Sequence, residues 1–269
     1  MQETLGIAGS GTIACGLAAT AASAGEVLLW ARSEQSAKRA HASIARSCAK
    51  VFGGEVNPDR VRIVNDIDAL SEATFLLEAV MEHHDLKAEV LAELGELARH
   101  AGAGAILGTT TSSLSISELA QASGHPERFV GFHPFNPVPR MKLVELAFPA
   151  EATENTRERA RAMAVTLGKT PIDVPDEPGF VVNRLLFPYL FSAVELMSKA
   201  GLEPEDVDRC MMLGASMPMG PIALLDYVGL DVAQAIGESI NARVPYRILE
   251  LVRAGKLGRK TGEGFYVYD

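Results

Sequence analysis

The residues best suited to chemistry surround His133, which Pro134 follows directly and Glu145 follows twelve positions later. A carboxylate that orients an imidazole and stabilises its cation forms a general-base pair. Such a pair can take the hydroxyl proton of a secondary alcohol while hydride leaves the same carbon, and it can also reverse the step because the ordinary pKa of histidine lies near neutrality. A lone histidine is more often structural, but here prolines fix the backbone after a predicted strand. We therefore expect His133 and Glu145 to act as an acid/base pair in a dehydrogenase.

The elements that would position this pair begin in the first residues of the sequence. Residues 4–8 are an apolar run that predicts a strand, residues 12–24 are rich in alanine and leucine and predict a helix, and residues 27–31 predict a second strand. A glycine-containing turn, Gly9-Ser10-Gly11, separates the first strand from the helix. A strand, a glycine turn, a helix and a strand in this order are typical of a parallel sheet.

The glycine turn has the pattern of a dinucleotide-binding fingerprint. Gly9 permits a tight turn, Gly11 lets the backbone approach a pyrophosphate, and the small Ala14 allows the helix to pack closely on the strand. A lone pattern of this type is weak, but here it follows a predicted strand and opens a predicted helix. We expect the turn to bind NAD or NADP through Gly9, Ser10, Gly11, Thr12 and Ile13.

The end of the second predicted strand bears on which dinucleotide is bound. An acidic residue normally stands there and hydrogen-bonds the ribose hydroxyls, which disfavours a 2′-phosphate. In this sequence Ala31, Arg32 and Ser33 occupy that place. A guanidinium offers paired donors that suit a phosphate. The sequence therefore predicts that NADP(H) is accepted. The alternative is that Arg32 stacks on the adenine or lies in solvent.

The alternation of strands and helices continues to about residue 175. Strands are expected at residues 74–80, 105–108, 129–132, 143–147 and 170–174, and helices at residues 86–99, 116–121 and 154–167. After the Pro-Asp-Glu-Pro-Gly segment at 175–179, only helices are expected, at residues 180–200, 203–213, 222–242 and 246–254. The sequence thus predicts an α/β fold in which a Rossmann-like, doubly wound sheet in residues 1–178 precedes an all-α domain in residues 179–269.

Composition narrows the class of protein further. The chain of 269 residues has a formal net charge of -9 and is 48% hydrophobic, which fits a globular protein and argues against a nucleic-acid partner. It has three widely spaced cysteines without a metal-binding pattern, its first residues show no basic segment followed by a cleavable apolar stretch, and no run of about eighteen apolar residues occurs. We expect a cytoplasmic protein with no bound metal and no membrane partner.

Short motifs are spread along the whole sequence. They are Gly9-Ser10-Gly11, Glu78-Ala79-Val80-Met81-Glu82, Thr111-Ser112-Ser113-Leu114, His133 to Pro139, Met141 to Glu145, Pro178 to Arg184, Met219-Gly220-Pro221, Leu225-Asp226, Gly229-Leu230-Asp231 and Gly258 to Tyr266. In order and spacing they resemble the L-3-hydroxyacyl-CoA dehydrogenase family, including its bacterial 3-hydroxybutyryl-CoA dehydrogenases. The resemblance runs essentially from end to end.

This resemblance implies both a reaction and a set of site residues. The reaction is the interconversion of a 3-hydroxyacyl thioester, such as short-chain 3-hydroxybutyryl-CoA, and its 3-keto form. His133 would be the acid/base and Glu145 its partner. Ser112 would hydrogen-bond the substrate oxygen at C3, and Asn183 would help to hold the substrate. The alternatives are that Ser112 forms a turn or caps a helix and that Asn183 caps a helix at the domain junction.

The resemblance also concerns the cofactor and the assembly. Glu82 and Lys87 match positions that line the cofactor near its nicotinamide half, although Glu82 could instead belong to a surface turn. Thr110 stands where the family usually has an asparagine close to the cofactor, so the pocket differs there. The all-α domain of the family supplies a dimer contact and closes over the substrate cleft, which implies a homodimer.

The carrier of the thioester is a further open point. Residues 36–59 look shorter than the helical hairpin with which many members of the family contact CoA. Lys38, Arg39 and Arg46 could attract the 3′-phosphate of CoA, or they could meet the acidic surface of an acyl carrier protein. CoA is the first expectation and the carrier protein the alternative.

Two further functions compete with this one. A dehydrogenase of free 3-hydroxy acids is the first, because relatives that act on carnitine or gulonate share the His-Glu arrangement, whereas enzymes with a catalytic lysine do not. The second is a non-catalytic nucleotide-binding protein that has kept the fold. The presence of Ser112, His133, Glu145 and Asn183 together argues against it.

Overall fold

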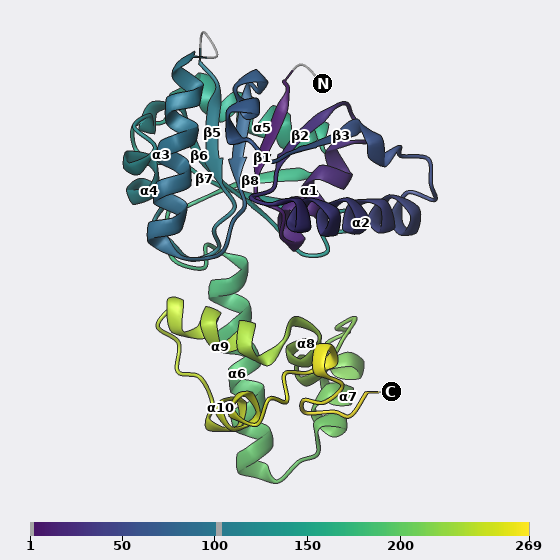
Figure 1. Ribbon diagram of the computed structural model, residues 1–269. Coiled ribbons are helices and arrows are strands. Elements are labelled where there is room, and N and C mark those ends of the chain that lie inside the picture. Colours follow the sequence, from purple (N-terminus) through teal and green to yellow (C-terminus); the bar gives the residue numbers. More distant parts are fainter. Residues whose placement is uncertain (1–2, 101–103, 269) are drawn as a thin grey trace. The chain divides into compact units, whose positions relative to one another are not determined.

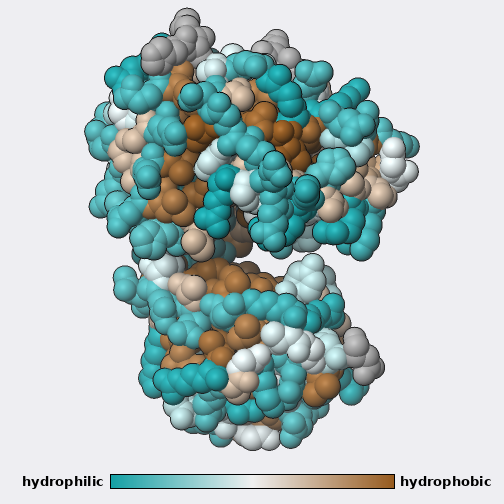
Figure 2. All heavy atoms as spheres, in the orientation of Figure 1, coloured by the Kyte–Doolittle hydropathy of each residue, from teal (hydrophilic) through white to brown (hydrophobic). Residues whose placement is uncertain are grey.

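The computed structural model describes residues 3–100 and 104–268. The chain divides into two compact units, Met1–Glu177 and Pro178–Asp269, which are called unit 1 and unit 2 (Figure 1). On each unit, hydrophilic side chains cover most of the visible surface, and apolar areas lie among these side chains (Figure 2). Within the described ranges, no helix is long and apolar enough to cross a membrane.

Unit 1 is built on a sheet of eight strands in the order β3-β2-β1-β4-β5-β6-β7-β8. The strands are β1 (Leu5–Ala8), β2 (Val27–Trp30), β3 (Val61–Val64), β4 (Phe75–Glu78), β5 (Ile106–Thr109), β6 (Phe129–Pro134), β7 (Leu143–Ala147) and β8 (Thr170–Val174). Neighbours from β3 to β6 pair in parallel, β6 and β7 are antiparallel, and β7 and β8 are parallel. The strand order reverses between β1 and β4, and in such sheets ligands bind outside the carboxyl ends of the strands at this point.

Five helices accompany this sheet in the described part of unit 1, and their bounds are α1 (Thr12–Ala21), α2 (Glu34–Val51), α3 (His84–His100), α4 (Ile116–Ala122) and α5 (Glu154–Thr166). Strands β1, β2 and β4 are almost wholly buried, as continuous apolar runs in a covered parallel sheet should be. Apolar side chains of α1, α2 and α5 form one core with the strands, while α3 packs against α4 and β5. These layers hold the strand ends in fixed positions.

Unit 2 is helical and contains α6 (Val182–Ala200), α7 (Pro204–Gly214), α8 (Pro221–Val228), α9 (Leu230–Ser239) and α10 (Tyr246–Arg253). Its core is separate from that of unit 1 and is formed by apolar side chains from all five helices. The prediction of one continuous helix at residues 222–242 was wrong. Gly229 has a φ of +103°, a conformation that favours glycine, and it separates α8 from α9.

Three other details differ from the sequence-based expectation. Strand β3 was not predicted, because it is a short strand at the edge of the sheet. Only its first residue is fully buried, and its second is an exposed arginine. The expected parallel sheet carries an antiparallel pair at β6 and β7. Helix α6 begins at Val182 rather than at residue 180, because Gly179 and Phe180 both have positive φ angles, +80° and +45°.

Candidate active site

His133 and Glu145 face each other across two antiparallel strands. They are directly paired in the register of β6 and β7, so both side chains project from the same face of the sheet. His133 Nδ1 and Glu145 Oε2 are 2.8 Å apart, and both side chains are buried. The ring of Phe135 packs edge-on against the imidazole at a centroid distance of 4.6 Å. The twelve-residue separation in the sequence therefore becomes a direct contact.

This hydrogen bond selects the form of the imidazole. A carboxylate accepts, so Nδ1 carries the hydrogen, and Nε2 is the nitrogen that exchanges a proton in the neutral ring. When the ring becomes positively charged, the buried carboxylate stabilises the cation strongly, because the surroundings screen the interaction less than water does. The pair has the geometry that general acid/base catalysis requires.

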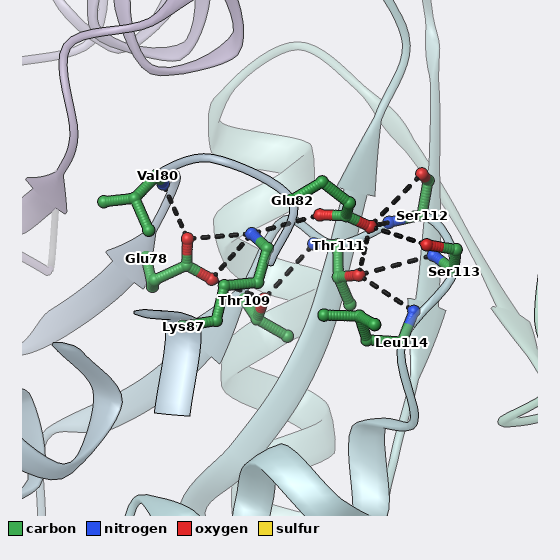
Figure 3. A network of polar contacts seen from close by, with 9 residues as sticks. All are labelled: Glu78, Val80, Glu82, Lys87, Thr109, Thr111, Ser112, Ser113 and Leu114. Atoms are coloured by element: carbon green, nitrogen blue, oxygen red, sulfur yellow. Dashed lines mark hydrogen bonds and ion pairs between the residues drawn. The ribbon is translucent and has the colours of Figure 1, made fainter. Parts of the chain in front are cut away.

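A second polar network lies at the carboxyl ends of β4 and β5 (Figure 3). Its centre is the fully buried carboxylate of Glu78, which accepts hydrogen bonds from Lys87 Nζ at 2.8 and 3.0 Å, from Thr109 Oγ1 at 2.7 Å and from the backbone N–H of Val80 at 2.6 Å. Lys87 is also almost fully buried. Buried charges are tolerated only when they are paired and hydrogen-bonded in this way.

The network continues outward from Lys87 to Glu82 and Ser112. Lys87 Nζ lies 3.3 Å from Glu82 Oε2, and the other oxygen of Glu82 accepts the backbone N–H of Ser112 at 3.0 Å. The same oxygen accepts hydroxyl hydrogen bonds from Thr111 at 2.5 Å and from Ser113 at 2.9 Å, and Ser112 Oγ lies 3.5 Å from it. Ser112 and Glu82 are thus brought together, although they are thirty positions apart.

The charge state of Glu82 follows from these contacts. Partial burial raises the pKa of its carboxyl group, but the positive charge of Lys87 and the hydrogen bonds from residues 111–113 outweigh burial. The net effect holds the pKa of Glu82 below its ordinary value. Glu82 is therefore a carboxylate at neutral pH.

Glu78, Thr109 and Thr111 were given no role by sequence reasoning. One signal was present in the sequence, because Glu78 is a charged residue that ends the apolar run Phe75 to Leu77. A carboxylate in such a buried strand needs a cationic partner, and Lys87 is that partner. Thr110, predicted to contact the cofactor, lies just beyond β5, where its backbone N–H donates to the carbonyl oxygen of Glu78.

The glycine turn lies between β1 and α1 and shows two different needs for glycine. Gly9 has a φ of +141°, and a Cβ atom there would lie 2.3 Å from the carbonyl oxygen of Ala79, so the fold itself requires glycine. A Cβ atom on Gly11 would meet nothing within 4 Å. The packing of the fold therefore does not require glycine at position 11, whereas a ligand that approached the backbone there would.

Helix α1 begins at this turn in a way that fits a pyrophosphate. Gly11 is its N-cap residue and provides no side-chain hydrogen bond, and the first turn carries no acidic residue. The backbone N–H groups at Thr12 and Ile13 thus point out of the helix start without a capping side chain. Such a helix end favours a negatively charged phosphate group, so these residues fit a dinucleotide.

The residues expected beside a 2′-phosphate stand between the end of β2 and the start of α2. Ala31 is buried, while Arg32 and Ser33 are exposed. Ser33 is the N-cap of α2 and forms a capping box with Ser36, so its hydroxyl group is used in the helix start. Ser33 thus caps a helix, and the guanidinium of Arg32 is the exposed group that could face a 2′-phosphate.

Asn183 lies in unit 2, in the first turn of α6, where it is buried. No side-chain capping bond is made at the start of that helix. The contacts of unit 1 join His133 to Glu145 and Ser112 to Glu82, whereas Asn183 belongs to the other unit. Among the described residues, no group of three or more His, Cys, Asp or Glu side chains could hold a metal ion.

Candidate residues at the ends of five strands of unit 1 share one edge of the sheet. Gly9 follows β1, Arg32 follows β2, Glu82 follows β4, Ser112 follows β5, and His133 is the next-to-last residue of β6. Because these strands are parallel, their carboxyl ends share an edge. A glycine turn that fits a dinucleotide and a buried His-Glu pair on one edge of such a sheet are typical of a dinucleotide-dependent enzyme.

Comparison with known proteins agrees with this site. Residues 4–177 match the NAD binding domain of 3-hydroxyacyl-CoA dehydrogenase, and residues 179–268 match its C-terminal domain. The chain is 35% identical to a probable 3-hydroxybutyryl-CoA dehydrogenase of Deinococcus radiodurans, over 98% of this chain and 99% of that one. It is 37% identical to the mitochondrial hydroxyacyl-coenzyme A dehydrogenase of Mus musculus, over 97% of this chain and 90% of that one. The crystal structure of (S)-3-hydroxybutyryl-CoA dehydrogenase from Ralstonia eutropha superposes with a TM-score of 0.91 at 35% identity, covering 99% of both chains.

The chain belongs to the 3-hydroxyacyl-CoA dehydrogenase family. This confirms the resemblance inferred from the sequence motifs and the fold class, a Rossmann-like domain followed by a helical domain. It also confirms that the protein is an enzyme, an oxidoreductase with a domain for a nicotinamide dinucleotide.

Proposed function

We propose that the protein interconverts 3-hydroxyacyl-CoA and 3-ketoacyl-CoA thioesters of short chain, such as 3-hydroxybutyryl-CoA, with NAD(P). The observation that carries the proposal is the buried 2.8 Å contact between His133 and Glu145 at the carboxyl edge of the sheet. It supplies the proton acceptor that oxidation of an alcohol requires. The names and the end-to-end similarity of the relatives supply the class of substrate.

In the oxidative direction, His133 takes the proton of the C3 hydroxyl group on Nε2, while Nδ1–H remains hydrogen-bonded to Glu145. Glu145 holds the ring in this orientation and stabilises the imidazolium that forms. A dinucleotide held at the turn of Gly9 to Ile13 would supply the hydride acceptor in this direction and the hydride donor in the reverse direction. Ser112 donates a hydrogen bond to the C3 oxygen, and Asn183 holds the substrate. In the reductive direction the imidazolium returns the proton to the C3 oxygen.

We also propose that NADP(H) is accepted as well as NAD(H). The support is that the end of β2 has no acidic side chain and presents the exposed guanidinium of Arg32. If Arg32 binds a 2′-phosphate, Arg32→Ala should raise KM for NADPH about tenfold, the effect of roughly one lost charge-assisted hydrogen bond, and leave KM for NADH unchanged. Equal use of NADPH by wild type and variant would show that Arg32 does not bind the phosphate.

Coenzyme A is the carrier that we propose for the thioester, and an acyl carrier protein is the alternative. Lys38, Arg39 and Arg46 are all exposed on α2, so each could meet either a 3′-phosphate or an acidic protein surface. For the assembly we propose a homodimer, because unit 2 exposes large apolar side chains, among them Leu185 and Leu213. We also propose a cytoplasmic location, because the three cysteines form no disulfide, and a role in fatty acid metabolism, because the proposed substrate is a 3-hydroxyacyl thioester.

A panel of substrates tests the proposal. Each of three substrates is offered with NADH and with NADPH: acetoacetyl-CoA, acetoacetyl-acyl-carrier protein and free acetoacetate. Oxidation of the cofactor is followed at about 340 nm, where the reduced nicotinamide of either dinucleotide absorbs. We expect acetoacetyl-CoA to give the highest kcat/KM. Turnover of the free acid alone would contradict the proposal that the substrate is a thioester. A higher kcat/KM for the carrier-protein substrate would show that an acyl carrier protein, and not CoA, is the carrier.

A further inference from the structure

The carboxylate of Glu82 connects the buried interior of unit 1 with the turn that carries Ser112 (Figure 3). One of its oxygens faces Lys87 Nζ at 3.3 Å. The other accepts from the Ser112 backbone N–H, from two neighbouring hydroxyl groups, and more distantly from Ser112 Oγ. A single side chain therefore fixes a turn of three consecutive hydroxyl residues.

Lys87 gives Glu82 a firm anchor. Its ammonium group is held by both oxygens of Glu78, and Glu78 is held in turn by Thr109, its partner in the register of β4 and β5. All three of these side chains are buried. The position of Glu82 is thus set by contacts that start in the sheet, and Lys87 cannot leave without exposing Glu78 as an unpaired buried charge.

The contact distances at Glu82 Oε1 differ in a useful way. Four donors from residues 111–113 approach this one oxygen, which is more than its lone pairs can serve well. The Ser112 hydroxyl group is the most distant of the four, at 3.5 Å, while its backbone N–H is at 3.0 Å. The backbone of Ser112 is held firmly, and its hydroxyl group is held loosely enough to turn toward another acceptor.

We propose that Glu82 is a positioning residue for Ser112, which it holds by the backbone so that the hydroxyl group can meet the C3 oxygen of the substrate. This inference rests on the proposed hydroxyacyl thioester chemistry. It assigns Glu82 a task beyond lining the cofactor, and it assigns Lys87 and Glu78 the task of holding Glu82. The hydroxyl group leaves its weakest contact when the substrate binds, while the three stronger contacts remain.

A carboxylate, rather than an amide, is required in this place. In Glu82→Gln, one orientation of the amide directs its NH₂ group at the Lys87 ammonium, and the other directs it at the N–H of Ser112 and the hydroxyl groups of its neighbours. Each orientation sets a donor against a donor, so the turn must shift. Glu82→Asp keeps the charge but withdraws it by one methylene, so it should disturb the turn less.

A double-mutant cycle between Glu82 and Ser112 tests the proposal. Glu82→Gln should lower kcat/KM for acetoacetyl-CoA about 100-fold, the effect of a misplacement of about 1 Å, and mainly through kcat. In a Ser112→Ala background the same substitution should lower kcat/KM less than about threefold, because the hydroxyl group that it positions is gone. Glu82→Asp should lie between wild type and Glu82→Gln. Glu89→Gln, an exposed residue on the same helix α3, is the matched control and should leave kcat/KM unchanged.

Cofactor binding and thermal unfolding separate the competing outcomes. The dissociation constant for NADH, followed through the fluorescence of Trp30, the only tryptophan, should change less than about threefold if positioning is the main task. A 100-fold loss in both backgrounds, or no loss in either, would overturn the inference. If wild-type protein turns over no thioester, the proposed function fails instead, and the two failures are distinguished by the wild-type rate alone.

Discussion

The substitution Glu145→Gln separates the geometry of the acid/base pair from its charge. The amide is the same size, and the site is buried, so the side chain has nowhere else to go. If its NH₂ group faces His133 Nδ1, the imidazole hydrogen moves to Nε2, which then cannot accept the proton of the substrate; if its oxygen faces Nδ1, the hydrogen stays on Nδ1. In both orientations the negative charge that would stabilise the imidazolium is lost.

The size of the effect follows from the lost charge. A carboxylate and an imidazolium whose charge centres lie about 4 Å apart interact by about 4 kcal/mol at an effective dielectric constant of about 20. At about 1.4 kcal/mol for each factor of ten, kcat should fall by about three orders of magnitude. The dissociation constant for NADH and the melting temperature should remain close to those of wild type.

The assay is the steady-state reduction of acetoacetyl-CoA by NADH at neutral pH. Glu158→Gln, an exposed residue on α5, serves as the control for removing a negative charge elsewhere in unit 1 and should keep wild-type activity. If Glu145→Gln retains more than about a tenth of the wild-type kcat, the carboxylate does not stabilise a cation in the transition state, and the argument from the 2.8 Å contact is refuted.

Three further predictions concern the scaffold of the site. Gly9→Ala should destabilise the protein by about 2 kcal/mol or more in urea titrations, because Gly9 has a positive φ and lies close to a carbonyl group. Gly11→Ala should leave the stability nearly unchanged but weaken NADH binding. Equal effects of the two substitutions on binding and on stability would contradict this difference. Lys87→Met should destabilise by about 3–5 kcal/mol because it leaves Glu78 as an unpaired buried charge, and adding Glu78→Gln should restore part of that loss; an additive double variant would argue against a coupled pair. The stabilisation due to Glu82, whose folded pKa lies below its ordinary 4.5, should be complete above that pH and disappear as the pH falls through the lowered value; acid titrations in which Glu82→Gln shows the same pH dependence as wild type would exclude it.

The sequence predicted the central elements of the fold well, because their signals are local. The glycine turn, the apolar strands and the cluster at residues 175–179 each mark a boundary within a few residues. The division of the long helix at residues 222–242 was missed because a glycine inside a helical pattern does not reveal its φ angle. The reversed direction of β7 was missed because a short apolar run looks the same in parallel and antiparallel pairs.

The candidate site was predicted to a different extent at each position. The contact between His133 and Glu145 could be expected from residue types and spacing, and the structure places them face to face. The chain of contacts from Glu78 through Lys87 to Glu82 and Ser112 could not be expected from the sequence. It joins β4, α3 and the segment after β5, and only the register of the sheet brings these segments together. The capping role of Ser33 was likewise not anticipated, since the same hydroxyl group suits either a helix start or a phosphate.

The most direct test of the central claim is the turnover of acetoacetyl-CoA by His133→Ala. Reduction by this variant should fall to the background rate, because no other residue is proposed to exchange the proton of the C3 oxygen. NADH binding, which we propose to depend on the glycine turn rather than on β6, should stay within about threefold of wild type. A His133→Ala protein that binds NADH normally and still reduces acetoacetyl-CoA at the wild-type rate would contradict the assignment of His133 as the acid/base.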